Sequence, residues 1–189
     1  MKKPNTVEEL TALLERCGVS IESWGTGKAK TVGHLLEELV LEEAFLVDTP
    51  DGRLVRETAV VCLDISAGAL VLKEAYQLFY RDGRRREREL DATTGEKMRP
   101  GETPHDAVQR LIREEFPVLL LQPAEDLKEG KTALRESESK SYTGLPTRYR
   151  LHFFSIELRI ELPAFTVLEP DKMSAYEWVE RRDVMPHPP

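Results

Sequence analysis

The chain has 189 residues, 32% of them charged, and a net charge of −7 at neutral pH. This length suits one domain with a sizeable core, and the acidic balance argues against a general nucleic-acid surface. No apolar run approaches the ~20 residues of a membrane span, and none follows the N-terminus as in a signal peptide. The two cysteines, Cys17 and Cys62, lack disulfide or zinc spacing. We therefore expect a cytoplasmic protein with no membrane partner.

Two helices are predicted near the N-terminus. Thr6-Val7-Glu8-Glu9 has the pattern of a capping box, and apolar residues at helical spacing follow as far as Cys17. Thr31 is a second candidate N-cap, because it precedes an apolar stripe that ends at Val40. We therefore expect an N-terminal helical extension over residues 1–45 and a second domain over residues 46–189.

Strands are predicted next, at residues 43–47, 54–65, 70–80 and 84–90. Asp51-Gly52 and Asp82-Gly83 are strong hairpin signals between them. Residues 58–65 are almost continuously apolar, which favours a strand that is buried on both faces. Together these features predict the first strands of a sheet.

The rest of the chain mixes both kinds of element. Pro104 begins a predicted helix that Pro117 ends, because proline suits the first helical position and breaks a helix interior. The later elements are expected as a strand at 118–121, a loop at 123–134, a strand at 149–158, weaker strands at 166–168 and 177–179, and a short helix from residue 180. This order predicts an α/β fold in which helices pack on a mixed sheet.

Three carboxylates flank the helix that begins at Pro104. Glu102 lies in the loop before the helix, and Glu114 and Glu115 lie at its end. Such a set can hold a hard divalent cation, because these ions prefer anionic oxygen ligands. The alternative is that Glu114 and Glu115 end a solvated helix and pair with arginines of the same helix.

This stretch resembles a Nudix box, whose pattern is G-x5-E-x7-R-E-U-x-E-E-x-G-U, where U is an aliphatic residue. Aligned on Glu102, the matching positions are Arg110, Ile112, Glu114, Glu115 and Val118. Three positions depart from the pattern: Glu96 replaces the first glycine, Leu111 the glutamate after the arginine, and Pro117 the late glycine. A second run, Ser-Tyr-x-Gly-Leu-Pro-Thr-x-Tyr at 141–149, is similar to a group of Nudix-like proteins with a degenerate box.

The resemblance implies both a fold and a reaction. The fold would be a Nudix-like α/β/α sandwich with a mixed sheet over roughly residues 57–184. The reaction would be hydrolysis of a pyrophosphate linkage in a small nucleotide-type substrate, a nucleoside diphosphate derivative. By position in the box, Glu102, Glu114 and Glu115 would hold Mg2+ or Mn2+, and Glu114 and Glu115 would be catalytic.

Leu111 leaves the chemistry open. It lies four residues before Glu115 and so faces the same side of the helix, where leucine can neither bind a metal nor take a proton. A metal can still bind through the three glutamates and a further acid from a later loop; the candidates are Glu136, Glu138, Glu157 and Glu169. The alternative is a catalytically inactive Nudix-fold module that binds a nucleotide or a protein partner. A third hypothesis is a homodimer held together by the N-terminal helices.

Two regions are candidates for substrate contacts. Arg84 and Arg86 share one face of a predicted strand, where guanidinium groups can bind phosphate. The alternative there is a charged edge strand that resists aggregation. In the polar run that begins at Ser137, Tyr142 can stack on a base and Arg148 can meet a phosphate. Equally, Tyr142 and Arg148 can anchor the loop.

Overall fold

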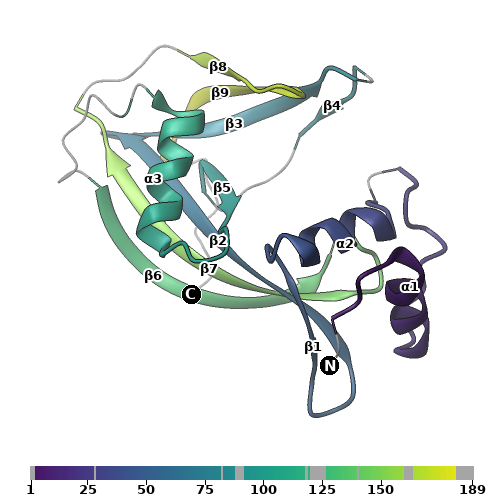
Figure 1. The fold of residues 1–189 in the computed structure, drawn as a ribbon. Helices are drawn as coiled ribbons and strands as arrows, with labels where there is room; N and C mark the ends of the chain where they lie inside the picture. The colour runs from purple at the N-terminus through teal and green to yellow at the C-terminus, as the bar shows by residue number, and fades with distance from the viewer. Residues whose placement is uncertain are drawn as a thin grey trace. The chain divides into compact units, whose positions relative to one another are not determined.

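The computed structural model describes residues 3–27, 29–81, 83–87, 92–117, 119, 127–139, 141–159 and 164–181 (Figure 1). Contacts divide the chain into two compact units. The first comprises Met1–Val60, Lys97–Thr103 and Thr132–Leu151, and the second comprises Val61–Glu96, Pro104–Lys131 and His152–Pro189. Three long strands contribute to both units: β2 (Leu54–Ala67), β6 (Leu127–Glu138) and β7 (Pro146–Glu157). The expected domain boundary at residue 45 stays a prediction.

The first unit begins with two capped helices. These helices are α1 (Val7–Arg16) and α2 (Val32–Val40). They are followed by strand β1 (Phe45–Asp48), which pairs antiparallel with β2. Thr6 Oγ1 accepts a hydrogen bond from Glu9 N at 3.2 Å, and Thr31 Oγ1 accepts one from His34 N at 3.3 Å. Both predicted N-caps are therefore confirmed.

The apolar faces of α1 and α2 build the core of the first unit. Its buried residues are Leu10, Leu13, Leu14, Val19, Trp24, Leu35, Leu39, Ala44, Leu54, Tyr142 and Leu145. The rings of Trp24 and Tyr142 lie 5.1 Å apart, and Trp24 Nε1 donates to the carbonyl of Thr143 at 2.9 Å. Buried aromatic pairs stabilise beyond the area that they bury, so the loop around Tyr142 is anchored to the N-terminal helices.

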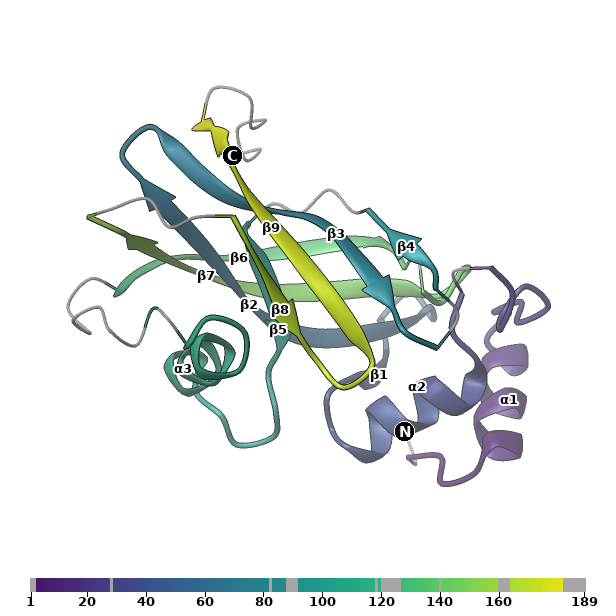
Figure 2. The same ribbon diagram turned by 90° about the horizontal axis from the view of Figure 1, so that it is seen from above.

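Most of the sheet belongs to the second unit. Its further elements are β3 (Leu70–Phe79), β4 (Arg85–Arg86), β5 (Thr94–Lys97), α3 (Pro104–Glu115), β8 (Phe165–Leu168) and β9 (Lys172–Glu180). The last residue of β5, Lys97, belongs to the first unit. The strand order is β6-β7-β2-β3-β9-β8, with β4 on β3 and β5 on β2. Strand β9 pairs antiparallel with both β3 and β8 (Figure 2). The prediction of an α/β fold with a mixed sheet is confirmed.

Among the described residues, no helix is long and apolar enough to cross a membrane.

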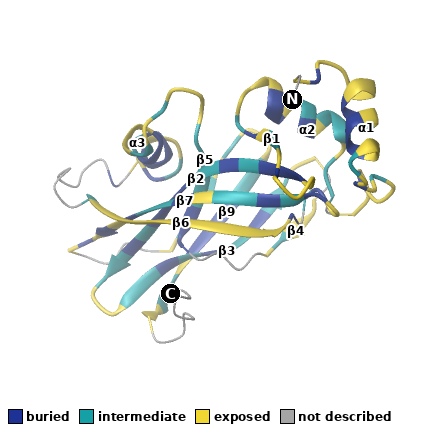
Figure 3. Ribbon diagram, turned by 90° about the horizontal axis from the view of Figure 1, so that it is seen from below, coloured by how far each residue is buried: buried dark blue, intermediate teal, exposed yellow. Residues whose placement is uncertain are grey.

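Strand β6 corrects the prediction of a loop at residues 123–134 from Leu127 on, whereas residues 123–126 lie outside the described residues. Its residues from Lys128 to Glu138 are all exposed (Figure 3), so they carry no apolar alternation from which a strand can be predicted. Pairing of the backbone with β7 at the edge of the sheet gives the strand instead.

The other differences concern short elements and element ends. Strand β5 was not predicted, β7 begins at Pro146 rather than at residue 149, and β9 is longer than the predicted 177–179. Leu119 lies in a 3-10 turn instead of the predicted strand at 118–121, whose other residues lie outside the described ones. Strand β4 covers only part of the predicted 84–90, and residues 88–90 also lie outside the described residues. Boundaries depend on pairing partners that local sequence does not specify.

Candidate functional site

Helix α3 carries Glu114 and Glu115, two of the three carboxylates of the box. Its buried stripe consists of Ala107, Val108, Leu111 and Ile112. Arg110 is only 5% exposed and pairs with Glu114 at 3.4 Å and with Glu96 of β5 at 3.7 Å. The helical pairing considered as the alternative is thus present for Glu114, and it also ties α3 to β5.

An aromatic cluster fixes the C-terminal end of α3 against β9. The ring of Phe116 lies 5.0 Å from that of Tyr176 and 6.0 Å from that of Phe165. Phe116 is 0% exposed and Tyr176 3%. Because these rings pack edge to face and exclude water, the residue just before Phe116 has little freedom. That residue is Glu115.

Glu115 presents one bound and one free carboxylate oxygen. Its Oε2 accepts hydrogen bonds from Thr94 Oγ1 at 3.0 Å and from Tyr176 Oη at 3.2 Å. Its Oε1 makes no hydrogen bond or ion pair with any described residue. Two hydroxyl donors on one oxygen orient the carboxylate and leave the second oxygen able to bind a cation or accept a proton.

The surroundings of Glu115 disfavour its negative charge. Burial raises the pKa of its carboxyl group, and the charges of Glu169 and Glu96 raise it further. The hydrogen bond from Thr94 and the charge of Lys172 act in the opposite direction but do not cancel this rise. A half-buried carboxylate with two acidic neighbours would be stabilised by a bound cation, which would offset both the burial and the repulsion.

Glu169 is the later acid that the structure brings near Glu115. It lies between β8 and β9, where Lys172 pairs with it at 2.8 Å. The other three candidates are elsewhere. Glu136 pairs with Arg53 and Arg148 in the first unit, Glu138 accepts from the backbone of Gly144, and Glu157 is exposed at the end of β7.

A chain of buried polar groups leads from Glu169 to Arg86. Ser174 Oγ donates to Glu169 at 3.5 Å, and Gln77 Nε2 donates to Ser174 at 3.2 Å and to Glu74 at 3.0 Å. Arg86 donates to Gln77 Oε1 through Nε at 3.1 Å and through Nη2. Gln77 and Ser174 are each 2% exposed. Neither residue was predicted from the sequence, although polar residues at inward strand positions are a usable signal.

The two candidate phosphate-binding arginines share one aromatic partner. The guanidinium of Arg84 lies 4.7 Å from the centre of the Phe79 ring, and that of Arg86 lies 5.1 Å from it. Arg85 instead lies over Tyr76 at 4.0 Å and pairs with Glu87. Arg84 and Arg86 thus lie over one ring and Arg85 over another, as expected for a strand, in which successive side chains point to opposite faces. Whether Arg84 and Arg86 bind phosphate stays a prediction.

Glu102 belongs to the first unit and closes its own turn. Its carboxylate accepts from Arg99 N at 2.7 Å, and its N–H donates to Arg99 O at 3.1 Å. Gly101 has a φ of 78°, in the left-handed region that glycine adopts without steric cost. The carboxylate is therefore held by the loop between β5 and α3 rather than left to rotate freely.

Tyr142 and Arg148 have structural partners in the first unit. Tyr142 is 1% exposed and packs in the core against Trp24, which is the anchoring role rather than a surface for base stacking. Arg148 pairs with Glu57 at 2.6 Å and with Glu136 at 3.2 Å. It also lines a cavity of about 280 Å³ with Phe45, Leu134 and Arg150.

The residues around Glu115 fit a cation that keeps much of its water. In the described part of the chain, no three histidine, cysteine, aspartate or glutamate side chains form a group that could hold a metal ion. Mg2+ does not need such a cage, because it usually binds one or two carboxylates, several waters and substrate phosphates. Oε1 of Glu115 has no partner among the described residues and could serve as one such carboxylate ligand.

Restoring the missing glutamate at position 111 is expected to destabilise the protein. Leu111 is 1% exposed, so Leu111→Glu replaces a buried apolar group by a carboxyl group without a designed partner. The expected loss is about 3–5 kcal/mol, against less than about 1.5 kcal/mol for the control Leu111→Met. Urea unfolding of the metal-free variants measures both. Equal stability of Leu111→Glu and wild type would show that this position has room for a carboxylate.

One family model matches the part of the chain that contains the box. The family model for the NUDIX domain matches residues 55–189, whereas the search of curated proteins gave no match. Among solved structures, similarity is found to the dihydroneopterin triphosphate pyrophosphohydrolase of E. coli, at 20% identity over 65% of this chain and 80% of that chain, with a TM-score of 0.42.

Two further solved structures are similar at lower scores. The Ap4A hydrolase of C. elegans is 14% identical over 66% of this chain and 81% of that chain, with a TM-score of 0.35. A Nudix hydrolase of M. smegmatis, RenU, is 19% identical over 74% of this chain and 82% of that chain, with a TM-score of 0.35.

Proposed function

The chain belongs to the Nudix family, and from this we propose that it is a hydrolase that cleaves a pyrophosphate linkage with the help of Mg2+ or Mn2+. The substrate class is a nucleoside diphosphate derivative in the cytoplasm. The observation that supports the proposal most is the carboxylate of Glu115, which has one oxygen fixed by two hydroxyls and the other without a partner among the described residues.

The residues around Glu115 suit this reaction. When bound, a divalent cation would neutralise the charge that grows on the leaving phosphate and lower the pKa of an attacking water. Glu115 would contribute its free oxygen as a ligand or proton acceptor. Glu114 and Glu102 would support it, by their positions in the box. Arg84 and Arg86 would bind phosphate oxygens, since a guanidinium offers paired donors to them.

We assign Glu169 as the acid that compensates for Leu111. Its charge acts on Glu115, and it is held by Lys172 and Ser174. Partners of this kind hold a site carboxylate in place and tune its charge, and losing one typically costs 10–100-fold in metal affinity or activity.

Glu169→Gln is expected to lower hydrolysis about 10–100-fold. It should also lower the pKa of Glu115 in the metal-free protein, because the charge of Glu169 raises that pKa in the wild type. Steady-state kinetics measures the first effect and carbon-13 NMR titration the second. Glu157→Gln is the control, since Glu157 is exposed at the end of β7. Unchanged kinetics and an unchanged pKa in Glu169→Gln would remove Glu169 from the site.

One observation favours the alternative of a catalytically inactive binding module. Leu111 is 1% exposed on the helix that carries the box, so one carboxylate of the family pattern is replaced by a core residue. An assay separates the two functions. The hydrolase should release phosphate or a nucleoside monophosphate from at least one substrate in a panel of dinucleotides and nucleotide sugars with Mg2+, and from none with EDTA. Tight nucleotide binding without cleavage of any substrate would favour the binding module.

A further inference from the structure

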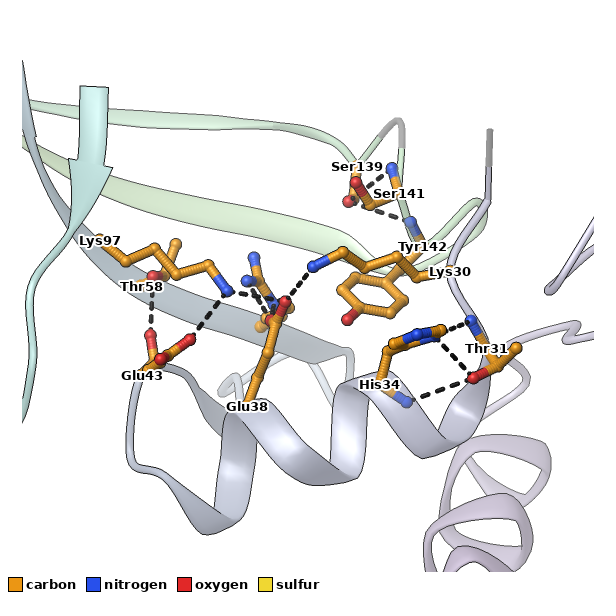
Figure 4. Close-up of polar contacts among 11 residues, drawn as sticks. Lys30, Thr31, His34, Glu38, Glu43, Thr58, Lys97, Ser139, Ser141 and Tyr142 are labelled. Carbon is orange, nitrogen blue, oxygen red and sulfur yellow. Dashed lines mark hydrogen bonds and ion pairs between the residues drawn. The ribbon is translucent and has the colours of Figure 1, made fainter. Parts of the chain in front are cut away.

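Helix α2 carries a buried carboxylate that is surrounded by three cations. Glu38 is 5% exposed. Its Oε1 lies 2.8 Å from Lys30 Nζ and 2.7 Å from Lys97 Nζ (Figure 4). Its Oε2 lies 2.5 Å from Arg56 Nη2. Burial would raise the pKa of Glu38, but Arg56, Lys30 and Lys97 outweigh burial and lower that pKa to about 2. The carboxylate is therefore charged at neutral pH.

Lys97 differs from the other two cations because it bridges two carboxylates. Its Nζ also pairs with Glu43 Oε2 at 3.3 Å. The backbone carbonyl of Glu43 in turn accepts a hydrogen bond from Thr58 Oγ1 at 2.8 Å. Because Thr58 lies on β2, this bond attaches Glu43 to that strand. The ammonium group of Lys97 is thus fixed from α2 and from the connection between α2 and β1.

Lys97 is also the last residue of β5 and directly precedes the loop that carries Glu102. After Lys97, Met98 N donates to Ala59 O at 3.0 Å and Arg99 N donates to the carboxylate of Glu102 at 2.7 Å. A continuous series of contacts therefore connects Glu38 with Glu102. It consists of the ion pair of Lys97, the hydrogen bond of Met98 to Ala59 and the turn that Arg99 and Glu102 close. All of these groups belong to the first unit.

We propose that Lys97 is a positioning residue through which α2 holds the loop of Glu102 in a conformation that can bind metal. The inference rests on the proposed function, which makes Glu102 a metal ligand. It gives the N-terminal helices a role in the reaction, although they lie outside the matched residues 55–189. Ion pairs shielded from water are screened less than surface pairs, and a small displacement of a ligand can cost about a hundredfold in rate.

Lys97→Met and Lys30→Met form a matched pair of variants. Both lysines pair with Oε1 of Glu38 at nearly equal distances, so each variant removes one cation from the same carboxylate. Only Lys97 is joined directly to the loop of Glu102, because it is the last residue of β5. We expect similar falls in thermal midpoint but Mn2+ binding about tenfold weaker in Lys97→Met than in Lys30→Met. Lys97→Arg should restore most of the affinity.

Amide hydrogen exchange tests the positioning role of Lys97 without relying on metal binding or hydrolysis. Amides of residues 98–103 should exchange faster in Lys97→Met than in Lys30→Met, whether or not metal is present. The milder variant Glu43→Gln should shift exchange in the same direction if Lys97→Met does not fold. Equal Mn2+ affinity and equal exchange in the two lysine variants would overturn the positioning role. If wild type binds no Mn2+, the proposed function fails, and exchange alone then decides whether Lys97 holds the loop.

Discussion

Glu115→Gln is expected to lower kcat for metal-dependent hydrolysis at least about a hundredfold. The amide of glutamine keeps the size of the side chain and can still accept from Thr94 and Tyr176, which hold Oε2 of Glu115 in the wild type. It loses the negative charge that would bind the cation or take a proton. The change therefore removes the chemistry and preserves the packing around Phe116 and Tyr176.

Steady-state kinetics at saturating metal and substrate measures this effect. The control is Glu129→Gln on β6, where the carboxylate is exposed, so its kcat should equal that of wild type. Stability of Glu115→Gln should match or exceed that of wild type at neutral pH, since burial and the charges of Glu169 and Glu96 disfavour the ionised form. A Glu115→Gln protein with wild-type kcat would exclude Glu115 from the reaction.

Glu38→Gln is expected to cost about 3–5 kcal/mol of unfolding free energy at neutral pH. Arg56 is 3% exposed and forms an ion pair with Glu38. Removing the carboxylate charge leaves a buried guanidinium beside two lysines that also lose their common partner. Glu37→Gln is the matched control, because Glu37 is the neighbouring residue on α2 and is exposed; it should change stability by less than about 0.5 kcal/mol.

The lowered pKa of Glu38 predicts that the protein loses stability over a defined range of acid pH. This pKa is lowered from 4.5 to about 2 in the folded protein, so the ionised group contributes stability above pH 4.5 that is lost as the pH falls toward 2. This contribution is about 3 kcal/mol. Urea unfolding at a series of pH values measures it. Between pH 4.5 and 2, wild type should lose this amount more than Glu38→Gln does, and parallel curves would contradict the assignment.

Local signals predicted the helices well. Thr6 and Thr31 are followed by apolar stripes, and capping depends only on residues within one turn, so both caps could be read from the sequence. The helix of the box could be predicted equally well, because Pro104 marks its start and an apolar stripe follows along it. Strand β6 could not be predicted, since an exposed edge strand is held by its pairing with β7 rather than by an apolar pattern.

The surroundings of Glu115 depend on residues far apart in the sequence. Thr94 and Tyr176 meet at its Oε2, and neither carries a local signal that distinguishes it from other strand residues. Glu169 was one of four candidate acids, and only the fold separates it from the others. Glu38 had a usable signal: it is a charged residue on the same helical face as the buried Leu35 and Leu39, where a carboxylate needs partners.

Binding of Mn2+ to the substrate-free protein, followed by the electron paramagnetic resonance signal of the free ion, tests most directly whether Glu115 holds the cation for hydrolysis. We predict saturable binding to wild type, weakened about tenfold or more in Glu115→Gln and unchanged in Glu129→Gln. Equal binding to wild type and Glu115→Gln, or no binding to either, would contradict metal-dependent hydrolysis at this carboxylate.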